Sequence, residues 1–189
     1  LVYGLAVCLK VLNVTRGVIA LEDNKADVVP VLEKAVAEFQ AGPGAGKGFE
    51  LEVRVLKTKY PQGGEKMLIT AVTGRQVPSG GLPMDVGTVV QNVGSLQAIA
   101  EAFLEGKPLI DRSFTVTGGA CRNPKNLRTP IGTVVSELVP QVFDVSEDLA
   151  RIVFGGPMMG VSVPTLDIPV QKNTSGVLLM DSREAVFFE

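Results

Sequence analysis

The sequence has no histidine, and its only cysteines are Cys8 and Cys121. Histidine is the commonest metal ligand and the commonest general acid or base near neutral pH, so its absence removes the most usual metal and proton-transfer sites. The two cysteines lie far apart in the sequence, and neither belongs to a Cys-x-x-Cys pair. We therefore expect no zinc or iron–sulfur site within these 189 residues.

Net charge and long apolar runs are also scarce. The chain carries 18 basic and 20 acidic residues that are interspersed, which argues against the clustered basic face of a nucleic-acid-binding protein. Its longest apolar runs, such as residues 17–21 and 176–180, are strand-length and fall well short of the roughly 18 residues that span a bilayer. No signal peptide is visible. We therefore expect a globular chain without a membrane span or a nucleic-acid partner.

The first part of the chain alternates predicted helices and strands. Apolar residues at helical spacing predict the helices, and short alternating or apolar runs predict the strands. In chain order, the expected elements are helix 1–12, strand 17–21, helix 26–40, strand 49–57 and helices 63–72 and 95–105. This order predicts a three-layer α/β unit over residues 1–110.

The composition changes after residue 110, where short strands replace the helices. Residues 123–130 are rich in turn formers, and residues 131–139 are expected to form a short helix. Short strands around one helix predict a small α+β domain of the β-grasp type over residues 111–170. Residues 171–189 are expected to supply a return strand and a tail.

Glycine pairs, prolines and a few short polar residues gather between residues 60 and 93. Gly63 and Gly64 precede an expected helix, where backbone N–H groups can bind a phosphate or another anion. The carboxylate of Glu65 can accept a hydrogen bond from a ribose or an amide. An ordinary solvated turn explains the same residues equally well.

Two other polar segments have the same double interpretation. Gln91 and Asn92 come directly before a helix, where asparagine most often caps the N-terminus, but an amide pair also suits a heterocycle edge or a phosphate oxygen. Residues 22–25 (EDNK) follow a strand, at the edge where α/β proteins usually bind ligands, or else they form a solvated turn. These residues alone leave the alternatives open.

The segments occur in an order that resembles a known family. The run YPQGGEKMLITAVTGRQVPSGGLPMDVGTVVQNVG, with EDNK before it and NPKNLRTPIGT, FGGPMMG and TSGVLLM after it, resembles the RnfC component of the Rnf electron-transport complex. That component is similar in turn to the flavin-bearing, NADH-oxidising subunit of respiratory complex I. The resemblance covers nearly the whole chain.

This resemblance implies an FMN and NADH site in the α/β domain, followed by a soluble-ligand-binding β-grasp domain. In the complex I relative, a Tyr-x-x-Gly-Glu-Glu stretch and an Asn-Asn pair face the flavin and the nucleotide. The matching cofactor-binding positions here are Tyr60, Gly63, Gly64, Glu65, Gln91 and Asn92. Gly64 stands where the relative has its first Glu, and Gln91 stands where it has its first Asn. No side chain is implied as catalytic or as a metal ligand, because hydride transfer from NADH to flavin needs no side-chain acid.

The chain begins without methionine, inside a helical pattern, and is expected to be the middle part of a longer subunit. The family's glycine-rich GxGGAxFPT loop would precede Leu1, and ferredoxin-like cysteine clusters for [4Fe-4S] centres would follow Glu189. The resemblance implies that the parent passes electrons between NADH and a ferredoxin-type carrier through FMN. It would do so with the other subunits of an ion-translocating complex, bound peripherally at the cytoplasmic face of the bacterial inner membrane. The fragment alone is expected to be inactive.

Two other functions remain compatible with these residues. The chain can be a non-enzymatic docking or ligand-binding scaffold of the same complex. Alternatively, it can belong to a flavoprotein similar to the cobalamin-reductase subunit of bacterial microcompartments, with the same fold and another electron acceptor. The stretch VPSGGLPMDVG favours the Rnf-like subunit over the cobalamin reductase.

Overall fold

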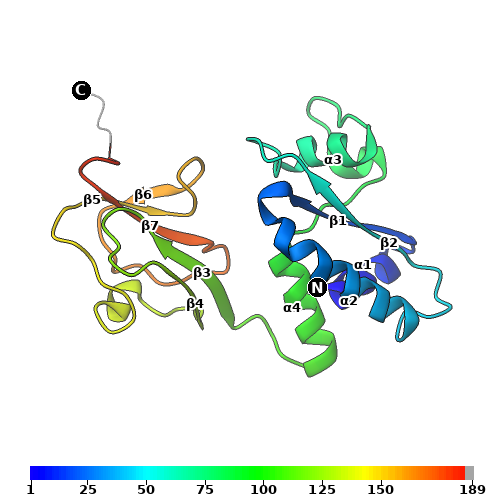
Figure 1. The fold of residues 1–189 in the computed structure, drawn as a ribbon, viewed down its shortest axis with the longest axis horizontal. Coiled ribbons are helices and arrows are strands. Elements are labelled where there is room, and N and C mark those ends of the chain that lie inside the picture. The colour runs from blue at the N-terminus through cyan, green and yellow to red at the C-terminus, as the bar shows by residue number, and fades with distance from the viewer. Residues whose placement is uncertain (186–189) are drawn as a thin grey trace. The chain divides into compact units, whose positions relative to one another are not determined.

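A computed structural model describes residues 1–185 of the chain. The chain divides into two compact units, with the boundary between Pro108 and Leu109 (Figure 1). The first unit combines α-helices with a parallel sheet, and the second is a mixed β-sheet with a 3-10 helix. The chain is therefore of the mixed α/β class that the sequence predicts.

The first unit is built on two parallel strands, β1 (Arg16–Glu22) and β2 (Glu50–Leu56). The chain connects them through the 3-10 helix η1 (Asp23–Val28) and helix α2 (Val29–Ala41). The predicted strand–helix–strand order is thus confirmed. Since the strands are parallel, both end at the same edge of the sheet, which is where ligands bind in α/β folds.

Helices α1 (Val2–Leu12) and α2 share one hydrophobic core with this sheet. Helix α4 (Val93–Glu105) crosses α1 so closely that a Cβ atom on Gly4 would lie 1.8 Å from the carbonyl oxygen of Leu96. Glycine at this position therefore allows the two helix backbones to touch. The buried hydrophobic residues of the core are Val2, Ala6, Ile19, Val36 and Phe39.

Helix α3 (Glu65–Thr73) lies on the other side of the sheet from α1 and α2 (Figure 1). Arg54 of β2 donates a hydrogen bond from Nη1 to the carbonyl oxygen of Val72 at 2.6 Å. The last carbonyl groups of a helix have no donor within the helix and carry its negative end charge, so a guanidinium group binds them well. This bond fastens the end of α3 to the sheet.

The second unit is a sheet with the strand order β4-β3-β7-β5-β6, in which β3 and β7 are parallel and the other neighbours are antiparallel. Every second residue of β3 and β7 faces inward, as a sheet with one covered face requires. Fully buried side chains of the core include Val116, Val135, Phe143, Val177 and Leu179. The strands are β3 (Asp111–Thr117), β4 (Lys125–Pro130), β5 (Leu149–Phe154), β6 (Val161–Val163) and β7 (Gly176–Asp181).

The structure differs from the sequence pattern at two places in this unit. Residues 131–139 do not form an α-helix and contain only the 3-10 helix η3 (Val135–Leu138). The stretch includes a run of β-branched residues, which are poor helix formers, and Pro140 follows it. Residues 123–130 are rich in turn formers, yet most of them form strand β4, which is paired along its length with β3. Pairing with a neighbouring strand has outweighed the local turn preference.

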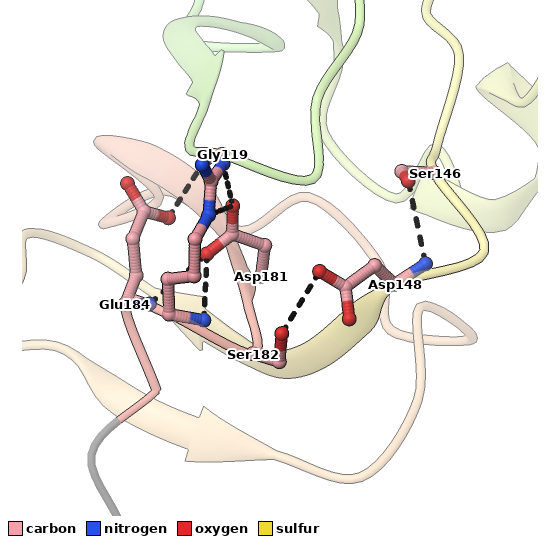
Figure 2. A network of polar contacts seen from close by, with 7 residues as sticks. Gly119, Ser146, Asp148, Asp181, Ser182 and Glu184 are labelled. Carbon is pink, nitrogen blue, oxygen red and sulfur yellow. Dashed lines mark hydrogen bonds and ion pairs between the residues drawn. The ribbon is translucent and has the colours of Figure 1, made fainter.

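Strand β7 ends in a buried carboxylate, Asp181, which is only 3% exposed. Its oxygens accept hydrogen bonds from the backbone N–H groups of Arg183 and Glu184 and from the guanidinium group of Arg183 (Figure 2). The carboxylate of Glu184 in turn accepts the N–H of Gly119 at 2.7 Å. This network joins the end of β7 to the loop that follows β3.

Candidate functional site

The loops that leave the carboxyl edge of the β1–β2 sheet are joined by Asp23 and Thr58. One carboxylate oxygen of Asp23 accepts hydrogen bonds from the backbone N–H and the hydroxyl group of Thr58, at 2.9 and 2.6 Å. The hydroxyl group is the main reason why the pKa of Asp23 lies below its ordinary value. Residues 22–25 and the loop before α3 thus meet at the edge where the sequence predicts a ligand.

The loop between β2 and α3 carries Tyr60, Gly63 and Gly64, and the fourth predicted cofactor-binding residue, Glu65, directly follows it. The loop consists of two successive tight turns, in which the N–H of Gln62 donates to the carbonyl of Lys59 and the N–H of Gly64 to the carbonyl of Pro61, each at 2.8 Å. Gln62 is buried, whereas Tyr60 is 64% exposed. The loop therefore presents the tyrosine to solvent from a compact backbone.

The start of α3 is open to solvent. Residues 63–67 are all exposed, and a Cβ atom placed on Gly63 would meet no other atom within 4 Å. Gly64 is the N-cap and Glu65 the first residue of the helix, where N–H groups have no acceptor within the helix. Such a terminus attracts phosphate and other anions, and the carboxylate beside it can accept hydrogen bonds from hydroxyl groups.

The loop of residues 78–87 is fastened to the same end of α3. The ammonium group of Lys66 donates to the carbonyl oxygen of Gly81 at 3.0 Å. Within the loop, the carboxylate of Asp85 accepts the backbone N–H of Leu82 at 2.8 Å. Lys66 therefore holds this glycine- and proline-rich loop beside the helix start.

The two members of the predicted amide pair have different environments. The side-chain oxygen of Asn92 accepts a hydrogen bond from the backbone N–H of Gly94 at 2.9 Å, so Asn92 caps α4. This is the structural role that its position before a helix predicts. Gln91 instead lines a cavity of about 790 Å³ in the first unit.

That cavity runs along the free edge of β1. Residues 14–20 line it consecutively, and since successive side chains of a strand point to opposite faces, the edge of the strand must face the cavity. Among residues 1–185, β1 pairs only with β2. Apolar side chains from α1, α3 and α4 supply much of the remaining wall, among them Leu5, Leu9, Leu68, Val72 and Leu96.

The structure therefore brings the predicted site residues together only in part. The four residues at and before the start of α3 are each exposed and lie within one short segment, whereas Gln91 lines the cavity and Asn92 caps a helix. Sequence reasoning missed the bond between Asp23 and Thr58. The signal that could have found it is an acid directly after one parallel strand and a threonine shortly after the next.

Metal-binding and membrane-spanning features are absent from the described part of the chain. No group of three or more histidine, cysteine, aspartate or glutamate side chains within residues 1–185 is placed to hold a metal ion. In the same residues, no helix combines the length and the apolar character that crossing a membrane requires.

Residues 1–101 match the family model of the Nuo51 FMN-binding domain. The chain belongs to this family. The matched residues include both strands of the first unit, the loop before α3 and most of α4. The fold is also similar to that of a chain in the crystal structure of an NAD⁺-reducing [NiFe]-hydrogenase in the H₂-reduced state. The TM-score is 0.77 at 21% identity, over 95% of this chain and 35% of that one.

Sequence relatives with higher identity are RnfC-type components of electron-transfer complexes, which confirms the resemblance. The relative from the proton-translocating ferredoxin:NAD⁺ oxidoreductase complex of Clostridium ljungdahlii is 45% identical over 94% of this chain and 36% of its own length. The corresponding component of the Na⁺-translocating complex of Acetobacterium woodii is 44% identical over 97% of this chain and 40% of its length. Its counterpart in the ion-translocating oxidoreductase complex of Vibrio cholerae is 40% identical over 94% of this chain. The chain spans 22% of that last relative and thus, with the 36% and 40% of the other two, less than half the length of each.

Proposed function

We propose that the first unit forms one wall of an FMN and NADH site in a redox subunit. The observation that carries this proposal is the position of the loop before α3. It brings Tyr60, Gly63 and Glu65 to the carboxyl edge of a parallel sheet, in a stretch that matches an FMN-binding domain. Ligands of α/β proteins bind at this edge, and the exposed start of α3 adds N–H groups that suit an anion.

The residues present fit such a cofactor. The open space beside Gly63 leaves room for a ligand close to the backbone, and the N–H groups at the start of α3 would bind phosphate. Glu65 would accept hydrogen bonds from ribose hydroxyl groups, and Tyr60 would offer an exposed ring and hydroxyl group. When bound, FMN supplies the hydride and electron transfer itself, and these residues bind and orient it.

The second wall of the site would come from another part of the parent subunit. The free edge of β1 and the apolar cavity beside it would be covered by the segment that carries the family's glycine-rich loop. Backbone N–H and C=O groups on an unpaired strand edge favour the addition of a further strand. The length of the relatives outside the matched region leaves room for such a segment.

The parent protein would then pass electrons between NADH and iron–sulfur carriers of the ferredoxin type. The relatives from Clostridium ljungdahlii and Acetobacterium woodii belong to ferredoxin:NAD⁺ oxidoreductase complexes that translocate protons or Na⁺. We place the [4Fe-4S] centres in a different segment of the parent, since both cysteines here are isolated. The second unit would be the β-grasp domain of this subunit, and the whole would be bound peripherally at the cytoplasmic face of the membrane.

Substitution of Glu65 in the full-length subunit tests this function. Glu65→Gln keeps the shape of the side chain and removes its charge, so it should weaken NADH binding. The measurement is the KM for NADH and the FMN content of the assembled complex. Glu33→Gln, which changes a carboxylate on α2, is the matched control and should change neither. An unchanged KM and FMN content in the Glu65 variant would rule out this wall of the site.

The incomplete site also predicts how the isolated chain behaves. Residues 1–189 alone should bind FMN weakly or not at all, because one wall is missing. Titration of FMN fluorescence with the purified chain measures this directly. Submicromolar affinity would show that the site is complete without another segment.

An alternative function is that the second unit docks onto another subunit of the complex, and one observation favours it. The turn between β5 and β6 exposes Met158 and Met159, which are 67% and 81% accessible. Exposed methionines adapt easily to an apolar partner surface, here another subunit of the complex. If docking is the main role, replacing both methionines with serine should block assembly, while Glu65→Gln should leave NADH oxidation intact.

A further inference from the structure

The side chains of Asp23 and Thr58 link the two loops at the carboxyl edge of the first sheet. The two residues lie 35 positions apart. Asp23 accepts hydrogen bonds from the backbone N–H and the hydroxyl group of Thr58. The Thr58 hydroxyl oxygen in turn accepts a hydrogen bond from the backbone N–H of Asn24 at 3.3 Å. The link is therefore reciprocal, and three hydrogen bonds fix the first residues of the loop that leads to α3.

The backbone between Thr58 and the start of α3 is short and compact, so the position of Thr58 determines the position of the helix start. The two turns that end at Gln62 and Gly64 leave little freedom between Thr58 and the helix. At the far side, the bond from Lys66 to the Gly81 carbonyl fixes the first turn of α3. Residues 60–65 thus lie between two anchors, and Asp23 makes the first of them.

We propose that Asp23 is a positioning residue for the NADH site, acting through Thr58 on the loop that carries Tyr60 and leads to Glu65. This inference rests on the proposed function of that loop. Asp23 itself need not touch the nucleotide. An ionised carboxylate accepts the two hydrogen bonds from Thr58 more strongly than a neutral group would, so the link is firm at neutral pH.

A purely structural role would have a different signature. If the bond only stabilises the fold, its loss should lower the free energy of unfolding and leave the kinetics of the folded enzyme unchanged. If it positions the loop, the KM for NADH should rise while kcat with an artificial electron acceptor changes little, because the flavin chemistry is untouched.

The test uses the assembled complex with substitutions in the full-length subunit. Asp23→Ala removes both hydrogen bonds and should raise the KM for NADH about fivefold to fiftyfold, as the loss of one or two net hydrogen bonds predicts. Thr58→Val removes the hydroxyl group and keeps the backbone donor, so it should have a smaller effect in the same direction. Thr58→Ser keeps the hydroxyl group and should keep the wild-type KM for NADH.

Asp27→Asn is the control, because Asp27 is an exposed carboxylate on the same 3-10 helix. It should leave KM and kcat unchanged. A complex in which Asp23→Ala and Thr58→Val both keep the wild-type KM would overturn the inference. If Asp23→Ala fails to assemble, the comparison of Thr58→Val with Thr58→Ser decides alone.

The Glu65→Gln variant distinguishes failure of the positioning role of Asp23 from failure of the proposed NADH site. A raised KM in Glu65→Gln with wild-type values in the Asp23 and Thr58 variants would refute only the positioning role. Wild-type values in all of these variants would refute both the site and the role of Asp23.

Discussion

Asn92 caps helix α4 by accepting the backbone N–H of Gly94 at its side-chain oxygen, over 2.9 Å. The nitrogen of the same amide group takes no part in this bond and is a donor. A single residue can thus stabilise the helix with its oxygen and bind a phosphate or heterocycle oxygen with its nitrogen. The capping role and the predicted cofactor role of Asn92 are therefore compatible.

Two substitutions at Asn92 separate these roles. Asn92→Asp keeps an N-cap acceptor and removes the donor, so the free energy of unfolding should stay close to wild type. Asn92→Ala removes both and should cost about 0.5–2 kcal/mol. If the amide also binds FMN or NADH, Asn92→Asp should impair FMN retention in the full-length subunit at least as much as Asn92→Ala does. The reason is that the aspartate adds a negative charge near a phosphate. Urea denaturation and FMN content measure the two effects, and full FMN content in Asn92→Asp would exclude the donor role.

The elements of the first unit could be predicted well from the sequence, because they are long and each has a repeating apolar pattern of its own. Helices α1, α2 and α4 each repeat their apolar residues over several turns, and these patterns persist in the structure. The second unit consists of short strands whose stability comes from pairing. Strand β4 has turn-forming residues and is held by β3, which no local pattern reveals.

The candidate site shows the same division between local and long-range information. The segment that bears Tyr60, Gly63 and Glu65 is contiguous, so its residues could be proposed from the sequence. The bond between Asp23 and Thr58 depends on the register of two parallel strands. The cavity beside β1 is formed by several separate segments, and its existence depends on how they pack rather than on any one of them.

A methyl group at Gly4 should force α1 and α4 apart. Alanine is normally the better helix residue by about 1 kcal/mol. Here its Cβ would lie 1.8 Å from a carbonyl oxygen of Leu96, and a backbone atom cannot move aside as a flexible side chain can. We expect Gly4→Ala to lower the free energy of unfolding by roughly 1–3 kcal/mol. Urea denaturation followed by circular dichroism measures it, with Lys10→Ala on the exposed part of α1 as the control. Equal or greater stability of Gly4→Ala would show that the helices are not this close.

In the second unit, Gly118 should be equally intolerant of substitution by alanine. Its φ of +115° is rarely adopted by residues with a side chain, and an added Cβ would lie 2.1 Å from the carbonyl oxygen of Leu179. Strain and overpacking together should make Gly118→Ala cost roughly 2–5 kcal/mol. Gly156→Ala is the matched control, because a Cβ there meets no atom within 4 Å. Thermal unfolding should show a large decrease in Tm for the first variant and almost none for the second. Similar Tm values for the two variants would contradict the close approach of β7.

The buried carboxylate of Asp181 should make the stability of the second unit depend on acid pH. The hydrogen bonds from the side chain of Arg183, followed by that from the backbone N–H of Glu184, lower the pKa of Asp181 below its ordinary value. A group whose pKa is lower in the folded than in the unfolded state stabilises the fold above its unfolded pKa of about 4, and this stabilisation is lost as the pH falls through the folded pKa. The free energy of unfolding should therefore fall as the pH drops below about 4.

Asp181→Asn isolates this effect from that of other acids, including Asp167, whose pKa is also lowered, by the hydroxyl groups of Ser136 and Thr165. Asparagine keeps an oxygen that accepts the backbone N–H groups but has no charge to lose. The variant should be less stable than wild type at neutral pH, and the difference should shrink as the pH falls below about 4. Urea denaturation at several pH values measures this, with Glu147→Gln, an exposed carboxylate, as the control. A stability difference between Asp181→Asn and wild type that stays constant down to about pH 2 would show that the charge of Asp181 does not stabilise the end of β7.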